Sequence, residues 1–517
     1  MPFFSHIHIA YGSESGRAEQ LAQQLQQQPC LAAHPHSIAS LNNTHLEQLP
    51  PHSLLLIVTS SFGDGEAPAN ADQFANYLEN LPACHISYAI FGLGDTSYDK
   101  FCGYSKHLDH LLQCKHATAI IERVDADLNY QAIFQQWLNL LIQALANPIT
   151  PPLSHSLSVK VYAANQTYAA QVLDIQQLAQ SAPAVFHLRL SLKESGIFYQ
   201  AGDLIYLQAP NADSLLAEFC HWFNDSSAKE VLQQKELRLL NKNILRDVAK
   251  ICDSTELKAL TKIANKKALE DYLYGHDLLD LLRDFDPEHR VSLQDLHALL
   301  PNLTARAYSI SSCGQTHPEY VDLCVREVSY QLGERHYYGT ASHYIAQCQA
   351  GDFLPIFAKS NPTFHLTNKQ IPIVMIGAGT GIAPYIGFLQ ALQREQRASS
   401  HYLFFGERHR LHDFLYQNEL EQYLHNGTLT KLFTAFSRDQ AEKVYVQDLL
   451  KQQAELIWQL IQQGAYFYVC GSKKMSKAID ESLLEIAERI GHQPYIDDFN
   501  NIVAHLVAEG RLLRDIY

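Results

Sequence analysis

Apolar runs alternate with an amphipathic segment at the N-terminal end of the chain. Residues 6–11 and 53–59 form short apolar runs, and residues 88–91 and 119–121 repeat the pattern. Between the first two runs, residues 18–28 place two leucines on one face, as an α-helix does. A continuous apolar run is typical of a parallel strand that is buried on both faces. The alternation therefore predicts a doubly wound α/β sheet in this part of the chain.

The middle of the chain has two different patterns. Residues 157–172 and 185–192 alternate apolar and polar positions, which is typical of antiparallel barrel strands. Residues from about 213 to 300 are rich in Leu, Lys, Asp and Ala and have helical spacing. Strand patterns return between residues 307 and 328. The sequence therefore predicts a β-barrel that a helical insertion interrupts.

Strand and helix patterns alternate again from residue 371 onward. Apolar runs at residues 373–376, 402–405 and 466–469 predict a second parallel sheet covered by helices. The segment before the barrel, residues 147–154, contains three prolines and no apolar periodicity. Because proline-rich segments act as semi-rigid spacers, this stretch predicts a linker.

Together these patterns predict a multidomain α/β protein. We expect a doubly wound sheet domain at residues 1–147, a linker at 148–156, a barrel domain at 157–365 with the helical insertion at about 211–300, and a second α/β domain at 366–517. The chain has 517 residues, which suits several domains, since single hydrophobic cores stop growing at roughly 250–300 residues.

The net charge of the chain is −15, which argues against nucleic acid as a partner because the phosphate backbone repels acidic proteins. Residues 1–147 carry −8 of this charge, so the first domain is the more acidic part per residue. This surplus has two interpretations of equal weight. It provides solubility, or it steers the first domain toward a basic partner protein.

The ten cysteines are scattered, with no Cys-x-x-Cys pair and no metal-ligand spacing. The sequence therefore indicates neither a disulfide framework nor a metal or iron–sulfur site. No apolar run is long enough to span a bilayer, and the N-terminus lacks the basic segment of a signal peptide. We expect a cytoplasmic protein that does not associate with a membrane.

Three loops with small or hydroxyl residues follow predicted strands of the first domain, at residues 12–18, 59–66 and 91–98. Ligands bind at the carboxyl edge of such sheets, and amides at a helix N-terminus bind phosphate. Phe62 and Tyr98 add a ring to two of these loops and can hold a planar heterocycle between them. Packing explains each ring alone, and helix capping explains the first loop alone. The three loops together favour a ligand.

The second half of the chain carries further nucleotide-type motifs. Arg306 begins an Arg-Ala-Tyr-Ser segment, and a fork-shaped guanidinium suits a diphosphate. Residues 376–384 form a glycine-rich turn between an apolar strand and a helix, which is typical of a dinucleotide site. The chain ends in Tyr517, two positions after Asp515. A terminal tyrosine alone is explained by packing, but with the other motifs it favours stacking on a flat cofactor.

With these motifs the chain resembles the diflavin reductases, which join a flavodoxin-type FMN domain to a ferredoxin-NADP-reductase-like unit. Residues 1–145 resemble the FMN domain, and the resemblance covers nearly the whole chain, weakest from about 211 to 300. It implies FMN, FAD and NADPH as cofactors. It also implies a flavodoxin-like doubly wound sheet, an antiparallel FAD-binding β-barrel with a helical insertion, and an NADP-binding α/β domain.

The resemblance assigns FMN to the loops of the first domain. Arg17 stands where the family usually has a small or neutral residue, so it adds a charge contact to the FMN phosphate or faces solvent. The implied FMN-binding residues are Ser13, Glu14, Ser15, Gly16, Arg17, Ala18, Ser60, Ser61, Phe62, Gly63, Leu93, Gly94, Asp95, Tyr98, Phe101 and Cys102.

The resemblance assigns FAD and NADPH to the second half of the chain. In the family's Arg-x-Tyr-Ser segment the arginine meets the FAD diphosphate, the tyrosine stacks on the flavin and the serine lies near its reactive nitrogen. The implied FAD-binding residues are Arg306, Ala307, Tyr308, Ser309, Gly339, Thr340, Ala341, Ser342 and Tyr517. The implied NADPH-binding residues are Gly379, Thr380, Ser437, Arg438, Lys443, Tyr445 and Gln447, where the later cations and hydroxyls suit a 2′-phosphate.

The resemblance also implies four catalytic residues, Ser309, Cys470, Asp515 and Tyr517. Ser309, Cys470 and Asp515 would orient the nicotinamide, and Tyr517 would stack over the flavin and move aside for it. Cys470 is equally well explained as a small buried hydrophobe, and without the surrounding motifs that interpretation is preferred.

Within the family the chain is most similar to the flavoprotein subunits of bacterial assimilatory sulfite reductases. Residues 122–127 and 437–448 and the final Arg-Asp-x-Tyr carry this similarity. It implies an NADPH-dependent flavoprotein oxidoreductase that passes electrons from NADPH to FAD, to FMN and to a sirohaem/iron–sulfur subunit. Two alternatives stay open. One is a haem acceptor protein of another kind, such as a monooxygenase, and the other is a flavin-binding module without hydride transfer.

Two departures from the family pattern bear on assembly and binding. The related subunits have an N-terminal assembly extension, whereas here the first strand pattern begins at once, so the sequence predicts no particular oligomeric state. Ala478 stands where the family usually has an aspartate that contacts the nicotinamide nucleotide, so that contact is expected to be missing.

Overall fold

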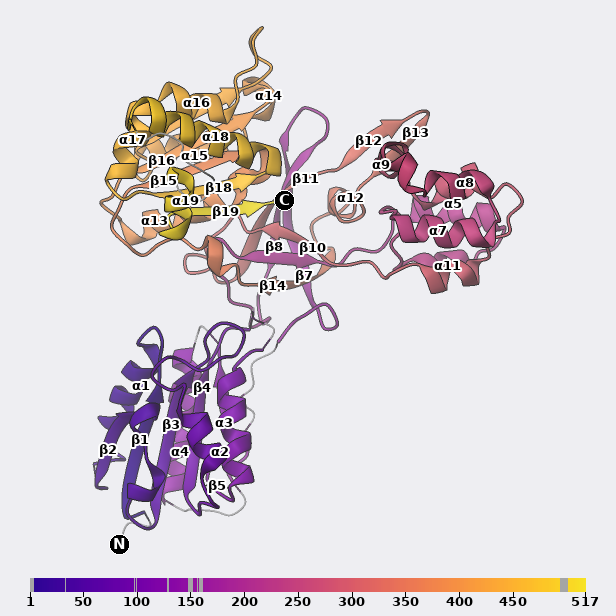
Figure 1. Cartoon of the computed structure of the whole chain (residues 1–517). Helices are drawn as coiled ribbons and strands as arrows, with labels where there is room; N and C mark the ends of the chain where they lie inside the picture. Colours follow the sequence, from indigo (N-terminus) through magenta and orange to yellow (C-terminus); the bar gives the residue numbers. More distant parts are fainter. Residues whose placement is uncertain are drawn as a thin grey trace. The chain divides into compact units, whose positions relative to one another are not determined.

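The computed structural model describes residues 4–32, 34–96, 98, 100–127, 130–146, 152–155, 157, 161–492 and 501–517 (Figure 1). It divides into two compact units. Unit 1 comprises Met1–Gln166, Glu194–Phe198 and Ala358–Ser360, and unit 2 comprises Thr167–Lys193, Tyr199–Phe357 and Asn361–Tyr517. Of the linker predicted at 148–156, residues 148–151 and 156 lie outside the described residues.

Unit 1 contains a parallel sheet with the strand order β2-β1-β3-β4-β5, in which β6 also pairs with β4. This is the order of flavodoxin-like folds. The strands are β1 His6–Gly12, β2 His36–Ser40, β3 Ser53–Ser60, β4 Ser87–Leu93, β5 Thr118–Ala119 and β6 Val124–Ala126. The helices are α1 Arg17–Gln26, α2 Phe74–Asn80, α3 Gly103–Cys114 and α4 Tyr130–Ala146, with 3₁₀ turns at Leu41–Asn43 and Leu46–Gln48.

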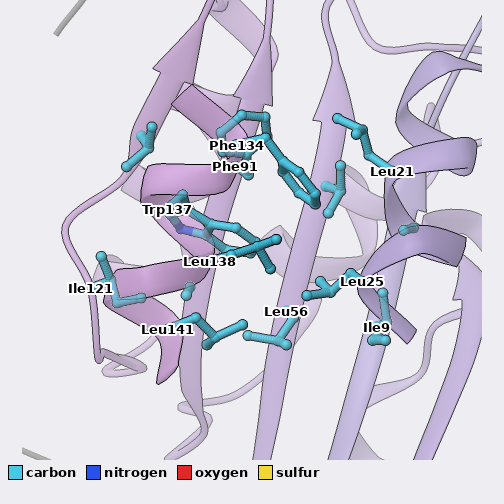
Figure 2. Packing of buried hydrophobic residues seen from close by; sticks show 14 of the residues in the cluster. Ile9, Leu21, Leu25, Leu56, Phe91, Ile121, Phe134, Trp137, Leu138 and Leu141 are labelled. Atoms are coloured by element: carbon cyan, nitrogen blue, oxygen red, sulfur yellow. The ribbon is translucent and has the colours of Figure 1, made fainter. Parts of the chain in front are cut away.

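The central strand β3 is buried on both faces of this sheet. Leu54 and Leu56 pack in the same cluster as α1 and α4, where the Trp137 ring is fully buried (Figure 2). Leu55 and Ile57 point to the other face and pack with α2 and α3. Each fully buried leucine stabilises the fold by about 1.5–3 kcal/mol. Burial on both faces explains the continuous apolar run and confirms the doubly wound prediction.

Several elements of unit 1 differ from the predicted ones, and the short strand β6 is not among the predictions. The helix expected at 18–28 runs from Arg17 to Gln26. The strand expected at 119–121 is shorter, because β5 ends at Ala119 and Ile121 forms only an isolated bridge to Leu153. The sequence pattern does not predict β2, because this edge strand is half-buried throughout and has no apolar run.

Unit 2 contains an antiparallel sheet with the order β10-β9-β14-β7-β8-β11. A bridge between Ile310 and Leu323 joins its two ends, which closes it into the predicted barrel. Of the strand expected at 157–172, residues 158–160 lie outside the described residues, residues 161–167 contain an isolated bridge between Ala163 and Gln166, and β7 begins at Tyr168. The barrel strands are β7 Tyr168–Ala179, β8 Val185–Ser191, β9 Leu204–Leu207, β10 Arg306–Ser309, β11 Tyr320–Arg326 and β14 Phe353–Lys359.

The chain between β9 and β10 forms the predicted helical insertion, with a leucine-rich core of its own (Figure 1). Side chains of Asn241, Ser254, Asp277 and Ser292 cap four of its helices by accepting backbone amides, which is why these helices start where they do. The helices are α5 Asp213–Phe223, α6 Ala228–Leu232, α7 Lys242–Ile251, α8 Thr255–Leu260, α9 Lys266–Leu273, α10 Leu278–Phe285 and α11 Leu293–Leu299, with a 3₁₀ turn at Ile263–Asn265.

After β11 the chain forms a hairpin, β12 Ser329–Leu332 and β13 Arg335–Tyr338, and the short helix α12 Thr340–Ala346. A 3₁₀ turn, η4 Pro362–Phe364, follows β14. The single predicted strand region at 307–328 is therefore two barrel strands, β10 and β11, and the hairpin beyond it is an element that the sequence pattern does not predict.

The second parallel sheet of unit 2 has the order β17-β16-β15-β18-β19. Its strands are β15 Ile373–Ala378, β16 His401–Glu407, β17 Lys431–Phe436, β18 Tyr466–Gly471 and β19 Leu512–Ile516. Its helices are α13 Ala383–Glu395, α14 Arg410–Asp413, α15 Gln417–His425, α16 Val446–Gln452, α17 Ala454–Gln462, α18 Lys473–Arg489 and α19 Ile502–Ala508, with the 3₁₀ turn η5 at Gly379–Ile382. β19 brings the last residues of the chain to the carboxyl edge of this sheet.

Across the described residues, no helix combines the length and the apolar character that crossing a membrane requires.

Candidate functional site

Loops after β1, β3 and β4 meet at the carboxyl edge of the unit 1 sheet, because these strands are parallel neighbours. The first loop turns at Gly16, whose φ of 81° favours glycine, and α1 begins at the next residue. The Ser13 hydroxyl accepts a hydrogen bond from the Ala18 amide at 3.2 Å. Arg17 is exposed and forms no ion pair with the part of the chain that the structure describes. The amides of the first turn of α1 and the Arg17 cation suit a phosphate.

Two polar residues that are not among the implied FMN-binding residues hold these loops in place. The Asn70 side chain accepts a hydrogen bond from the Ser13 amide at 2.7 Å. The carboxylate of Asp127, which is buried, accepts from the Thr96 hydroxyl at 2.5 Å and from its amide at 3.3 Å. The Glu14 carboxylate also has a partner within the protein, the Ala69 amide at 2.9 Å. No pattern in the sequence marks Asn70, since its role depends on loops that meet only in the fold.

The aromatic residues at this edge differ in exposure. The Phe62 ring is 53% exposed, and its backbone pairs with Glu66 in a tight turn. Tyr98 is half-buried. Phe101 and Cys102 are buried, so these two implied FMN residues can reach a ligand only through their backbone. Phe62 and Tyr98 are therefore the rings available for stacking.

One cavity of about 370 Å³ in unit 2 brings the two implied FAD diphosphate segments together. Arg306 on β10 and residues Gly339–Ser342 at the start of α12 line it. The Arg306 guanidinium forms an ion pair with Glu236 at 3.1 Å. Arg238 and Arg326, which the sequence analysis did not single out, also line this cavity. It therefore combines glycine amides with several guanidinium groups, as a diphosphate requires.

A second cavity of unit 2, of about 610 Å³, holds the implied flavin-stacking residues. Tyr308, Ser309, Asp515 and Tyr517 line it. Tyr517 as a whole residue is 61% exposed, and its hydroxyl lies 3.1 Å from the hydroxyl of Thr380 in the glycine-rich turn. β19 fixes this position, since the Tyr517 amide donates to the Gly471 carbonyl at 3.2 Å.

Three of the four implied catalytic side chains form one hydrogen-bonded cluster at this cavity. The Ser309 hydroxyl donates to the Asp515 carboxylate at 2.5 Å, and the Cys470 thiol donates to the same oxygen at 3.7 Å. Burial raises the pKa of the Asp515 carboxyl above its ordinary value, although both hydrogen bonds oppose that shift. Burial and the nearby Asp515 carboxylate hold the pKa of the Cys470 thiol well above its usual range, so the thiol stays protonated.

The glycine-rich turn packs closely against the neighbouring strand. A Cβ on Gly381 would lie 2.2 Å from the Cys470 carbonyl oxygen, and one on Gly377 would lie 2.8 Å from the Gly381 carbonyl. Gly379 has a φ of 59°. Glycine is therefore required here by backbone contact as well as by conformation.

A third cavity of unit 2, of about 340 Å³, lies on the other side of this turn. Ser437, Tyr445 and Gln447 line it, as does Ala478. Arg438 and Lys443 do not line it; both are exposed on the segment between β17 and α16. Arg408 and Lys474 also line the cavity, although the sequence analysis did not single them out.

Comparisons with known proteins agree with this geometry. Residues 9–137 match the family model described as flavodoxin, residues 241–344 match the FAD binding domain, and residues 375–481 match the oxidoreductase NAD-binding domain. The sulfite reductase (NADPH) flavoprotein alpha-component of Shewanella oneidensis is 32% identical over 519 residues, which cover 94% of this chain and 85% of that protein. The proteins of the same description from Bacillus subtilis and Vibrio cholerae are each 32% identical over 99% of this chain, covering 89% and 87% of their own lengths.

The chain belongs to the diflavin reductase family. As in other diflavin reductases, FMN and FAD are its cofactors and NADPH is its nucleotide substrate.

The residues of this diflavin reductase fit those groups. In unit 1, a Cβ on Gly94 would lie 2.6 Å from the Cys102 sulfur, so the loop after β4 packs too closely against Cys102 to accept a side chain at Gly94. In unit 2, a Cβ on Gly339 would lie 2.8 Å from both Ser342 and Val328. At both glycines a larger residue would clash with the protein itself, so only glycine allows these close-packed loops, and each loop stands beside rings or cations that suit a flavin nucleotide.

Proposed function

We propose that this diflavin reductase is the NADPH-oxidising flavoprotein component of a sulfite reductase. In this function it takes electrons from NADPH and delivers them to a separate haem protein subunit that reduces sulfite. The relatives reported above carry that name in full and match almost the whole chain. The three family-model matches supply the same order of cofactor domains.

The observation that carries the proposal is the cavity that Ser309, Asp515, Tyr308 and Tyr517 line, with the buried Cys470 thiol bonded to Asp515 from behind. A flavin-binding module without hydride transfer has no need of a buried carboxyl that accepts both a hydroxyl and a thiol. A reductase needs such a cluster, because the nicotinamide gains positive charge as it is oxidised and a nearby carboxylate stabilises that charge.

When bound, FAD accepts a hydride from NADPH, and FMN passes electrons on singly. The chain's own residues position and hold these groups. Tyr308 and Tyr517 offer two rings that line one cavity. Ser309 and Cys470 donate to Asp515, which keeps its carboxylate directed into that cavity. Arg438 and Lys443 are exposed cations for the 2′-phosphate that distinguishes NADPH from NADH.

The proposed acceptor is a separate haem protein, as the names of the relatives imply. The acidic surplus of residues 1–147 suits a partner that presents basic residues around its haem.

The test is reconstitution of the complete reaction. The full chain, loaded with FMN and FAD, is mixed with the sirohaem/iron–sulfur subunit of a sulfite reductase, and NADPH-dependent release of sulfide is measured. Reduction of cytochrome c by NADPH, with the chain alone, is followed in parallel. We expect both activities.

The two measurements separate the parts of the proposal. Cytochrome c reduction without sulfide release would show a reductase of another haem protein and overturn the assigned acceptor. Absence of cytochrome c reduction in a preparation that holds both flavins would overturn NADPH oxidation itself.

A further inference from the structure

Backbone hydrogen bonds fix the position of Arg438, which comes directly after the end of β17. The residue is exposed, and its guanidinium forms no ion pair within the part of the chain that the structure describes. The last residue of β17, Phe436, is paired with Glu407 at the end of β16. One step further, the Ser437 amide donates to the Glu407 carbonyl at 2.9 Å. The Arg438 amide in turn donates to the Arg408 carbonyl at 2.9 Å, so the pairing of the two segments continues past the strand ends and includes Arg438.

The next residue, Asp439, extends this pairing with its side chain. One carboxylate oxygen accepts the Arg410 amide at 2.9 Å, and the other lies 3.0 Å from Nδ1 of His409. Arg410 is the first residue of the short helix α14, where a backbone amide has no acceptor within its own helix, so Asp439 supplies the missing acceptor. The Arg410 amide, and after it the His409 ring, lower the pKa of the Asp439 carboxyl, so the group is ionised at neutral pH.

The segment that holds Asp439, residues 408–410, is itself anchored. The His409 amide donates to the Asp413 carboxylate at 3.2 Å, and the Asp413 side chain is buried. The Arg410 guanidinium lies 5.4 Å from the centre of the Phe436 ring, where a cation is attracted to the aromatic face. The 408–410 segment is therefore a fixed support for the residues that follow β17.

The charge of Asp439 needs an explanation, because the residue is adjacent to the arginine that is implied in binding a dianion. A carboxylate that faced the 2′-phosphate would repel it and weaken the effect of Arg438. Both oxygens of Asp439 instead have donors in the 408–410 segment. Charge-assisted hydrogen bonds of this kind fix the geometry of the groups that they join.

We propose that Asp439, held by the 408–410 segment, is a positioning residue that keeps Arg438 at the 2′-phosphate of NADPH. The proposal rests on the proposed function, since NADPH is the substrate there. Asp439 then contributes to the binding of nucleotides that carry a 2′-phosphate, and it contributes nothing to the use of NADH, which lacks that group.

The experiment measures binding to the flavin-loaded full chain by calorimetry, with 2′-AMP and NADP⁺ as probes. For Asp439→Ala we expect the Kd of both probes to rise about fivefold, the factor for loss of one ordinary hydrogen bond. Asp439→Asn should lie between Asp439→Ala and the wild type, because its amide oxygen can still accept the Arg410 amide. The kcat/KM for NADH, measured by ferricyanide reduction, should not change in either variant. An equal loss with NADH would show a general structural role and overturn the proposal.

Glu442→Ala is the matched control for loss of charge. Glu442 is exposed on the same segment between β17 and α16 and forms no ion pair within the described residues, so its removal takes away a carboxylate without taking away a support. We expect its affinity for 2′-AMP to equal or slightly exceed that of the wild type, since less negative charge repels the phosphate less. Asp439→Ala that binds 2′-AMP as tightly as the wild type, or more tightly, would overturn the proposal.

A double variant tests whether His409 acts through Asp439. His409→Ala should weaken 2′-AMP binding less than Asp439→Ala does. The double variant should be no weaker than Asp439→Ala alone, because the effects of residues in contact are not additive. Fully additive effects would show that the two residues act independently, which overturns the proposal.

The wild type separates this proposal from the proposed function. Wild-type protein that uses NADH as well as NADPH and does not bind 2′-AMP would overturn the choice of NADPH in the proposed function, and this inference with it. Wild-type protein that binds 2′-AMP, together with an Asp439→Ala variant of unchanged affinity, would overturn this inference alone.

Discussion

Asp515 shows how much of the chemistry of unit 2 depends on single residues. Its carboxylate accepts hydrogen bonds from Ser309 and Cys470, two residues that lie 206 and 45 positions away in the sequence. Burial nevertheless raises its pKa, so desolvation outweighs the two donors. Ionisation of Asp515 therefore lowers the free energy of unfolding.

That cost gives a pH dependence with a defined sign. A raised pKa means that the folded protein keeps the Asp515 proton where the unfolded chain has already lost it. As pH rises above 3.8, the ordinary value for the residue, the wild type should lose stability relative to Asp515→Asn until the folded pKa is passed. We expect the two melting temperatures to diverge by a few degrees, measured at a series of pH values in the flavin-loaded protein. Melting curves that stay parallel across that range would contradict the burial argument.

The residues that the sequence revealed and those that it hid differ in a physical way. Arg306, Ser309 and the glycines of the 376–384 turn stand in short motifs, so the sequence alone singles them out. Arg326 and Glu407 belong to ordinary strand ends, 81 positions apart, and only the fold brings them together. Two opposite charges at that sequence separation form no local pattern from which their contact could be predicted.

At the scale of elements, burial decided which strands could be predicted. β3 and β15 have both faces covered and appear as continuous apolar runs. β19 lies at the edge of its sheet, and four of its five residues are half-buried. Its sequence, Leu-Leu-Arg-Asp-Ile, therefore lacks a strand signature, although it positions both Asp515 and Tyr517.

The contact between η5 and β18 is the tightest of the glycine-rich turn and gives a test. Gly381→Ala places a methyl group 2.2 Å from the Cys470 carbonyl oxygen, a backbone atom that cannot rotate away. We expect a loss of about 1–3 kcal/mol in the free energy of unfolding, measured by urea denaturation. Gly406→Ala is the matched control on β16, since its methyl would lie 3.5 Å or more from its neighbours. Equal stability of the two variants would show that the turn can shift away from β18 and accommodate the methyl group without loss of stability.

At the scale of the whole molecule, the negative charge is densest in residues 1–147. Residues 1–147 account for −8 of the total of −15, although they are less than a third of the chain. Composition predicted this asymmetry and the alternating patterns predicted the classes of fold, because both depend on averages over many residues. The linker predicted at residues 148–156 is too short for such averages to describe it, and most of it lies outside the described residues.

The asymmetry predicts how the protein meets its acceptors. Reduction of cytochrome c, a basic protein, should slow severalfold as ionic strength rises from 10 to 200 mM, roughly the range over which the screening length falls from about 30 to 8 Å. Reduction of ferricyanide, a small anion, should not slow in the same series. Both rates are measured with saturating NADPH, so that changes in nucleotide binding do not contribute. Equal salt dependence for the two acceptors would leave the acidic surplus as a solubility feature.

The helix α3 has a practical consequence. It starts beside the loops after β3 and β4 and, as the connection between parallel strands, runs back toward the opposite edge of the sheet, where it ends at Cys114. Cys114 is the one exposed cysteine of the ten, and burial raises the pKa of Cys30, Cys84 and Cys102 in the same unit. A maleimide dye would therefore attach first at Cys114, away from the flavin, and could follow unit 1 by fluorescence during turnover.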